Sequence, residues 1–282
     1  MYRIRHDECD AYGVLNNAAY LRLAQETAWR HSIAFGFGYD YYEKLQRAWV
    51  TRDSAIDYIQ PVTYGDQLAV TTYIHSSSRT SARRMFEFQI DAEPVAAART
   101  DYVYLDIPRQ APARIPTEII AALFPGEEQP AKMKREPFPD PAPAPSGAVT
   151  WQRRVEWRDV DPFGHLNNAV YLSYTQEAAN EAGLAYGVTH ASSSEAGLGW
   201  ALKRSRIEYL RPALLAEMVQ IETWLTSLRQ ASAVRFYSIS RELDGEQLAR
   251  AESHWLTVDL DSGKPRRLPQ WMREAMSPNL SS

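Results

Sequence analysis

The chain has 282 residues, a length that fits two domains of ordinary size, and 45% of its residues are hydrophobic, enough for each domain to bury a core. Its net charge of −4 argues against nucleic acid or an anionic membrane as the main partner. The single cysteine, Cys9, excludes an intrachain disulfide and a cysteine metal cluster. The first residues form no apolar signal segment and no apolar run is long enough to span a bilayer, so we expect a cytoplasmic protein.

The first half predicts one helix and a series of strands. A short strand at residues 2–5 is followed by a turn around Gly13 and a helix over about residues 17–35. Further strands are predicted near residues 48–59, 67–76, 82–91 and 94–106. Because consecutive strands joined by short turns favour antiparallel pairing, we expect an α+β unit in which an antiparallel sheet curls around its helix.

A proline-rich segment separates the two halves. Residues 125–149 contain seven prolines, namely Pro125, Pro130, Pro137, Pro139, Pro141, Pro143 and Pro145. Proline fixes φ and lacks the backbone donor, so this segment is predicted to be an extended, semi-rigid linker and not a third domain. We therefore expect an N-terminal domain over residues 1–124 and a C-terminal domain over residues 150–282.

The second half follows the same order of elements. A strand at residues 151–157, a turn at Gly164 and a helix over about residues 168–186 precede strands near residues 199–210, 217–227, 231–242 and 246–260. Both helices are apolar on more than one face, which predicts that they are largely buried. Glu26 and Glu177 lie on these helices, and we expect an arginine or a backbone amide to pair with each carboxylate.

The second half also repeats the first in sequence, 151 residues later. Residues 10–28 read DAYGVLNNAAYLRLAQETA and residues 161–179 read DPFGHLNNAVYLSYTQEAA, with eleven of nineteen positions identical. Average composition predicts roughly one identity in such a stretch. Solenoid repeats have periods of about 20–50 residues, so this longer period indicates a whole domain that was duplicated and fused.

The repeated motif resembles a known family. The pattern Asp-x-x-Gly-His-Leu-Asn-Asn-x-x-Tyr, from Asp161 to Tyr171, and the strand signature Ile-Glu-Tyr-Leu-Arg-Pro at residues 207–212 resemble hotdog-fold thioesterases of the 4-hydroxybenzoyl-CoA thioesterase type. The resemblance covers both halves almost entirely, and acyl-ACP thioesterases are similar in being tandem hotdogs. It implies two hotdog domains, each a long central helix wrapped by an antiparallel β-sheet. It also implies that the domains pair as an intramolecular pseudo-dimer with active sites at their interface.

The chemistry of thioester cleavage agrees with this motif. A thioester carbonyl needs a nucleophile or a base-activated water, and it needs donors for the developing oxyanion. A carboxylate just before a helix can supply the first, and the amides and positive dipole of the helix N-terminus can supply the second. By the resemblance, Asp161 is the catalytic nucleophile or general base, His165 orients the substrate or a water, and the backbone N–H near Asn168 polarises the carbonyl.

The other motif residues are candidates for shaping the site and binding substrate. An Asn ahead of an apolar helix is commonly an N-cap, and for Asn16 and Asn167 this role is favoured over direct chemistry. The motif glycines are predicted turn formers, and glycine at position 164 also lets a substrate approach the backbone closely. The candidate substrate-binding residues are Gly13, Asn16, Asn17, Gly164 and Asn167.

The two halves are not equivalent at the motif. The first half keeps Asp10 but has Val14 where the second has His165. We therefore predict the main site at Asp161 and His165, with Asp10 as a candidate second site. The similar acyl-ACP enzymes carry Asn two residues after the Asp, whereas this chain has Phe163, which favours an acyl-CoA over an acyl-ACP substrate.

The sequence thus predicts a thioesterase that hydrolyses an acyl-CoA or related acyl thioester. The alternatives are an acyl-ACP thioesterase and a non-catalytic acyl-CoA-binding protein, while a dehydratase of the same fold fits the motif order less well. CoA or the acyl carrier is part of the substrate, so no separate cofactor is expected, and the histidine spacing predicts no metal. Cys9 is expected to be a small buried thiol and not the nucleophile. The acyl group and the association of two chains into a homodimer are left open.

Overall fold

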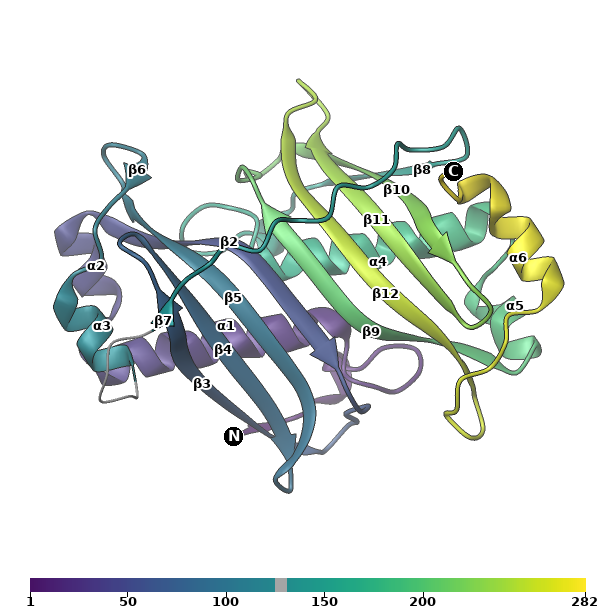
Figure 1. The fold of residues 1–282 in the computed structure, drawn as a ribbon, viewed down its shortest axis with the longest axis horizontal. Coiled ribbons are helices and arrows are strands. Elements are labelled where there is room, and N and C mark those ends of the chain that lie inside the picture. The colour runs from purple at the N-terminus through teal and green to yellow at the C-terminus, as the bar shows by residue number, and fades with distance from the viewer. Residues whose placement is uncertain (125–130) are drawn as a thin grey trace. The chain divides into compact units, whose positions relative to one another are not determined.

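The computed structural model describes residues 1–124 and 131–282, which form two compact units, Met1–Pro137 and Phe138–Ser282 (Figure 1). The unit boundary falls inside the predicted linker at residues 125–149. Part of that linker, with Pro125 and Pro130, lies outside the described residues. Its described part, residues 131–149, divides between the two units, so that the units extend beyond the domain limits predicted from the sequence.

In the first unit one long helix packs against an antiparallel sheet. The helix α1 spans Asn17–Ala34, and the sheet has the strand order β1-β3-β4-β5-β2. The strands are β1 Tyr2–Arg3, β2 Arg47–Tyr58, β3 Gln67–Ser77, β4 Ser81–Ile90 and β5 Glu93–Asp106. The shorter elements are a 3-10 helix at His6–Glu8, α2 Tyr39–Leu45, β6 Ala111–Pro112, α3 Thr117–Leu123 and β7 Ala131–Lys132.

The second unit repeats this architecture. The helix α4 spans Asn168–Ala185, and the strand order is β9-β12-β11-β10-β8. The strands are β8 Val149–Arg154, β9 Leu198–Tyr209, β10 Met218–Leu228, β11 Ser232–Arg241 and β12 Gln247–Asp259. The shorter elements are 3-10 helices at Trp157–Asp159 and Ser277–Asn279, α5 His190–Glu195 and α6 Gln270–Met276. The predicted tandem α+β hotdog architecture is confirmed, while the pairing of the two domains as a pseudo-dimer stays a prediction.

Alternating burial explains why each sheet packs on its helix. On β4 every second residue from Ala82 to Phe88 is buried, as expected for a strand with one face on a core. Phe88 meets Tyr20 of α1 edge-to-face with ring centroids 5.5 Å apart, and Tyr20 meets Tyr58 of β2 at 5.2 Å. The second unit has the equivalent pair, Tyr171 and Tyr209, at 5.4 Å. The repeated tyrosines are therefore core contacts between helix and sheet, each worth about 0.5–1.5 kcal/mol beyond the area it buries.

Both central helices also expose a few polar residues beside the apolar positions that they bury. Arg22, Glu26 and Arg30 of α1 are exposed and four residues apart, so they form one polar stripe along the helix. Glu26 pairs with Arg30 at 2.6 Å, which is the kind of partner expected for it. Glu177 of α4 is exposed too. Neither carboxylate therefore bears the desolvation cost that the apolar composition of the helices suggested.

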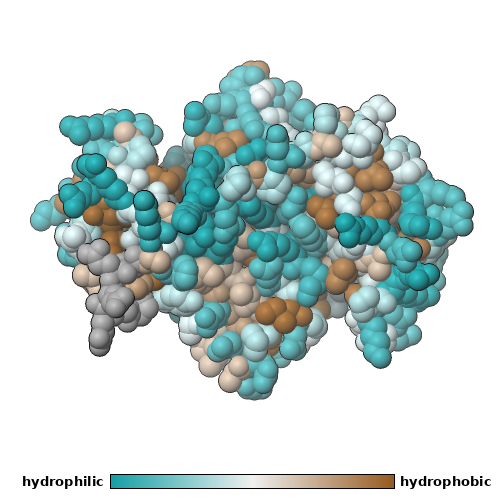
Figure 2. All heavy atoms as spheres, viewed as in Figure 1, coloured by the Kyte–Doolittle hydropathy of each residue, from teal (hydrophilic) through white to brown (hydrophobic). Residues whose placement is uncertain are grey.

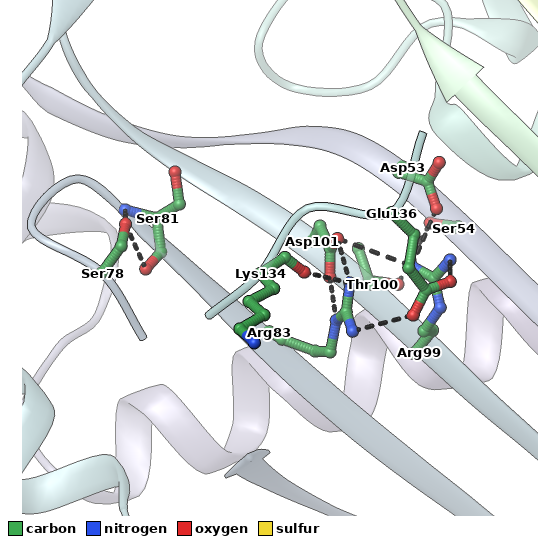
Figure 3. Close-up of polar contacts among 10 residues, drawn as sticks. All are labelled: Asp53, Ser54, Ser78, Ser81, Arg83, Arg99, Thr100, Asp101, Lys134 and Glu136. Atoms are coloured by element: carbon green, nitrogen blue, oxygen red, sulfur yellow. Dashed lines mark hydrogen bonds and ion pairs between the residues drawn. The ribbon is translucent and has the colours of Figure 1, made fainter. Parts of the chain in front are cut away.

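The described linker residues of the first unit lie on the face of the sheet opposite α1 (Figures 1 and 3). Glu136 reaches Arg83 at 3.1 Å and Arg99 at 3.0 Å. Each arginine also pairs with a buried carboxylate, Arg83 with Asp101 at 2.7 Å and Arg99 with Asp53 at 2.8 Å. Glu136 thus completes a network of ion pairs on the sheet, and we call this contact the ionic anchor.

The linker residues of the second unit are held by aromatic packing. Phe138 is only 6% exposed and packs with Trp224 and Phe236. The guanidinium carbons of Arg206 and Arg250 lie 5.0 and 4.9 Å from the centroid of the Phe138 ring, within the range of cation–π contacts. We call this contact the aromatic anchor.

The surface of the chain is mixed in character. Figure 2 shows hydrophilic residues over much of the visible face, with smaller apolar areas among them. Scattered exposed apolar side chains are normal for a folded protein. None of the helices in the described ranges combines the length and apolar character that crossing a bilayer requires.

Candidate active site

The motif of the second unit folds into a tight loop in front of α4. The backbone N–H of Asp161 donates to the carbonyl of His165 at 3.0 Å, and the N–H of Gly164 donates to the carbonyl of Asp161 at 2.9 Å. Gly164 has φ +81°, a conformation that residues with a side chain rarely adopt, and the space around it is open. The loop therefore sets Asp161 and His165 opposite each other, so that the structure brings the two predicted catalytic residues together.

The loop leads directly into the helix. Asn167 is the N-cap of α4, and its Oδ1 accepts the N–H of Ala169 at 2.9 Å. Such a cap is typically worth about 1 kcal/mol. Asn168 is the first helical residue, so its amide belongs to the turn that carries the positive end of the helix dipole.

A tyrosine from the sheet holds the first residue of each central helix. The Tyr209 hydroxyl donates to the carbonyl of Asn168 at 2.8 Å, and the Tyr58 hydroxyl donates to the carbonyl of Asn17 at 3.2 Å. Tyr209 belongs to the strand signature at residues 207–212, and Tyr58 belongs to its counterpart at residues 56–61, 151 residues earlier. Their place in the sequence is thus explained by their support of the helix start.

The first unit builds the same loop. The N–H of Asp10 donates to the carbonyl of Val14 at 2.8 Å, and the N–H of Gly13, at φ +75°, donates to the carbonyl of Asp10 at 2.9 Å. Asn16 caps α1 by accepting the N–H of Ala18 at 3.0 Å. The candidate residues of the first half therefore occupy positions equivalent to those of the second, with Val14 in place of the histidine.

The environment of Asp161 alters its acidity. One carboxylate oxygen, Oδ1, accepts the backbone N–H of Phe163 at 2.9 Å, so the side chain also shapes the turn. Burial raises the pKa of Asp161 above its usual value, although the Phe163 hydrogen bond and the nearby His165 act in the opposite direction. A carboxylate with a raised pKa is a stronger base, and perturbed pKa values are common at catalytic positions.

The surroundings of Cys9, next to Asp10, keep its thiol protonated and do not activate it as a nucleophile. It is half-buried, and its sulfur lies 3.6 Å from the carbonyl of Arg5. Burial, followed by the charges of Asp10 and Glu8, raises the pKa of the Cys9 thiol. Because the thiolate is the nucleophilic form, this position disfavours nucleophilic catalysis by Cys9.

The structure also reveals a contact that was not predicted. The hydroxyl of Tyr174, on α4, donates to Asp159, two residues before Asp161, at 2.8 Å. Neither residue belongs to the motif, and no pattern in the sequence pairs them. Elsewhere in the described ranges, no group of three or more His, Cys, Asp or Glu side chains is arranged to hold a metal ion.

Comparison with known proteins identifies the family. The family model of the thioesterase-like superfamily matches residues 4–123 and, a second time, residues 155–276. The chain belongs to this superfamily. Each match spans the motif loop, the central helix and the four long strands of one unit, β2–β5 in the first and β9–β12 in the second.

Two curated relatives from Escherichia coli match a stretch of this chain about as long as one of the two superfamily matches. The long-chain acyl-CoA thioesterase FadM of strain K12 is 27% identical over 125 residues, which are 44% of this chain and 94% of that protein. The acyl-CoA thioester hydrolase YbgC of strain O6:H1 is 28% identical over 122 residues, 43% of this chain and 89% of that protein.

A solved structure matches nearly the whole chain. The 12:0-ACP thioesterase from Umbellularia californica superposes with a TM-score of 0.69 at 19% identity, covering 91% of this chain and 92% of that one. At this identity the likeness shows a shared fold.

Proposed function

We propose that this protein is a thioester hydrolase that cleaves an acyl-CoA or a related acyl thioester into a free acid and a thiol. Membership of the thioesterase-like superfamily supports the reaction class, and the names of FadM and YbgC support acyl-CoA as the substrate class. The carrier we propose is CoA, because Phe163 stands where the similar acyl-ACP enzymes carry Asn. We also propose a cytoplasmic location, which fits a chain with a single cysteine.

One observation carries the assignment of the site to the second unit. Asp161 lies on a turn that ends at the N-terminus of α4, it faces His165 across the loop, and burial raises its pKa. This arrangement combines a carboxylate suited to act as a base with a helix end suited to stabilise a negative charge.

The reaction follows from these groups. In the general-base route, Asp161 takes a proton from a water molecule whose oxygen attacks the thioester carbonyl carbon. The electron pair of the C=O bond moves onto oxygen, where the amide near Asn168 and the positive end of α4 stabilise it. The C=O bond then reforms, the C–S bond breaks, and the leaving thiolate takes the proton back from Asp161. His165 orients the water or the substrate.

A nucleophilic route uses the same residues in a different order. The Asp161 carboxylate attacks the carbonyl carbon and expels the thiolate, which leaves a mixed anhydride that water then hydrolyses. A single turnover in ¹⁸O-labelled water detects the nucleophilic route when water attacks the anhydride at the aspartyl carbonyl, because label then enters the Asp161 carboxylate. Label in the product acid alone excludes that attack, and it is produced both by the general-base route and by attack of water on the acyl carbonyl of the anhydride.

The test is hydrolysis of a substrate panel by the purified protein. Short, medium, long and aromatic acyl-CoAs and one acyl-ACP are incubated with the protein, and thiol release is followed after subtraction of the Cys9 background. We expect release from acyl-CoA, a loss of roughly 10²–10⁴-fold in kcat for Asp161→Ala, and a much smaller loss for the matched Asp10→Ala variant.

Two outcomes would redirect the assignment. Unchanged turnover in the Asp10→Ala, Asp161→Ala double variant would remove both aspartates from the chemistry. Binding of acyl-CoA without release of thiol from any substrate would support the non-catalytic acyl-CoA-binding protein, and the aspartates would then be turn formers only.

A further inference from the structure

A buried hydrogen bond joins the segment that enters the Asp161 loop to the helix that leaves it. Tyr174 donates its hydroxyl proton to Asp159 Oδ2 at 2.8 Å, and the two residues are only 4% and 8% exposed. Asp159 ends a 3-10 helix, and the same Oδ2 accepts the backbone N–H of Glu156 at 3.1 Å. The Asp159 carboxylate is therefore held from two sides.

Asp159 also closes the base of the loop. Its carbonyl accepts the backbone N–H of Asn167, the N-cap of α4, at 2.9 Å. The next pair inward, Val160 and Leu166, forms a β-bridge. Because Asp161 follows Asp159 by two residues, a shift of Asp159 moves the candidate catalytic carboxylate and the helix cap together.

The donor of this hydrogen bond is fixed as well. The Tyr174 ring packs edge-to-face on Trp151 with centroids 5.7 Å apart. Burial, and next the bond to Asp159, raise the pKa of Tyr174 far above its usual value, so the hydroxyl stays protonated and continues to donate. Arg153, which pairs with Glu156 at 2.9 Å, acts on the pKa of Tyr174 in the opposite direction, but burial and the bond to Asp159 outweigh it.

The first unit folds the same loop without this bond. At the equivalent positions, 151 residues earlier, it has Glu8 and Leu23. Leucine cannot donate, so the Glu8 carboxylate has no counterpart of the tyrosine hydroxyl there. Glu8 accepts the backbone N–H of Arg5 at 2.8 Å, just as Asp159 accepts that of Glu156. The base of the loop is nevertheless closed, with the N–H of Asn16 on the carbonyl of Glu8 at 2.8 Å. The Tyr174–Asp159 bond is thus not needed to form the loop, and it occurs in the unit that has the histidine.

We propose that Tyr174 and Asp159 are positioning residues that hold the loop of Asp161 and His165 in its reactive geometry. This inference rests on the proposed function and adds to it the device that sets the geometry of the site. A base must lie within hydrogen-bond reach of the proton it takes, and a displacement of about 1 Å can cost roughly 10²-fold in rate. A buried donor that fixes the entry to the loop limits such displacements.

The test is the Tyr174→Phe variant, which removes one oxygen and keeps the ring on Trp151. We expect kcat to fall roughly 10-fold or more while KM changes by less than about 2-fold, because the loss concerns placement of the base and not substrate binding. We also expect the acid limb of the pH profile of kcat to move to lower pH. A looser loop admits water, and this relieves the burial that raises the pKa of Asp161.

The matched control is Tyr237→Phe in the same unit. Its hydroxyl lies 2.8 Å from Ser253 Oγ of β12, so this buried tyrosine of β11 hydrogen-bonds to another strand and not to the segment that enters the loop. We expect Tyr237→Phe to lower stability comparably without changing kcat or the acid limb. If both variants lose activity only in proportion to their loss of folded protein, or if Tyr174→Phe keeps its kcat and acid limb, the inference is overturned.

A second measurement does not depend on turnover. Amide hydrogen exchange reports the opening of the loop through the N–H groups of Asp161 and Asn167, which both donate within it. We expect faster exchange of these amides in Tyr174→Phe and unchanged exchange in Tyr237→Phe; equal rates in both variants would contradict the positioning role. If the wild-type protein or Asp161→Asn showed that the proposed function is wrong, the exchange rates would still decide whether Tyr174 holds the loop.

Discussion

The two units share the backbone of the motif loop but differ in the side chains around it. In both, an aspartate opens the turn, a glycine with positive φ closes it and an asparagine caps the helix. The second unit adds His165 and the buried bond between Tyr174 and Asp159, where the first has Val14, Leu23 and Glu8. The residues present twice, including both candidate aspartates, fold the loop, and we propose that the residues present once adapt the second loop for chemistry.

The two sheets also carry one buried arginine each at equivalent positions. Arg84 of β4 and Arg235 of β11 are each buried and donate to a threonine hydroxyl on the adjacent strand, at 3.5 and 3.4 Å. Their other partner differs. Arg84 Nη1 lies 3.1 Å from His31 Nδ1, whereas Arg235 Nη1 donates to Asn279 Oδ1 at 3.0 Å. The first unit therefore uses a titratable acceptor where the second uses a neutral amide.

The largest contrast in stability is expected between the two linker anchors. Phe138→Ala empties a buried site between Trp224 and Phe236, and we expect it to lower the free energy of unfolding by about 3 kcal/mol or more. Glu136→Gln weakens the ionic anchor, but Glu136 is 51% exposed and its arginines keep their buried carboxylates, so we expect a loss of about 1 kcal/mol or less.

Urea denaturation at two salt concentrations checks this contrast. Added salt is expected to shrink the effect of Glu136→Gln, since exposed charges are screened, and to leave that of Phe138→Ala in place. Equal losses in the two variants would mean that the ionic anchor contributes far more than an exposed ion pair normally does.

Exchanging the residues at the motif tests the chemical difference between the units. His165→Val gives the second loop the residue of the first, and we expect kcat to fall roughly 10–100-fold. The acid limb should move to higher pH, because His165 lowers the pKa of Asp161 and its removal lets that pKa rise. The reciprocal Val14→His should add little activity, because the first unit lacks the Tyr174–Asp159 bond.

The readout is kcat against pH for both variants with the best substrate of the panel. A gain of activity from Val14→His in an Asp161→Asn background would show that the histidine alone is sufficient to make the first loop catalytically active. Full activity of His165→Val with an unmoved acid limb would remove His165 from the site.

The sequence allowed the regular elements and the motif loop to be predicted, but not the contacts that surround the loop. The strand predicted at 217–227, for example, is observed at Met218–Leu228. Its ends were predictable because turn residues mark the ends of strands, and the duplication supplies each of these signals twice. By contrast, Tyr174 and Asp159 are 15 residues apart, and Arg83 and Glu136 are 53 residues apart. Such pairs are made by tertiary packing and leave no periodic trace in one sequence. The short helices α2, α3, α5 and α6 were missed for a related reason, because a segment of six or seven residues carries little helical pattern.

The smallest effect is expected where the buried arginines differ. Arginine has no acceptor, so the His31 ring nitrogen facing Arg84 must accept, which requires a neutral imidazole. Burial, and next the charge of Arg84, lower the pKa of His31 from its usual value of about 6.5. Between the lowered pKa and about 6.5 the unfolded chain binds a proton that the folded chain does not. The stabilising contribution of the pair is therefore complete above about pH 6.5 and is lost as the pH falls through this window.

The variant His31→Asn replaces the titratable partner of Arg84 with a neutral amide, the kind of acceptor that Arg235 has in the second unit. We expect the free energy of unfolding of this variant to fall less on acidification than that of the wild type. The difference should be less than about 1 kcal/mol, because His31 is only half-buried. Urea denaturation midpoints between about pH 5 and 8 measure the effect, with His75→Asn as the control at an exposed histidine of β3. Parallel pH dependence in the wild type and His31→Asn would show that the acid sensitivity arises elsewhere, and that the two arginine sites are equivalent in stability despite their different partners.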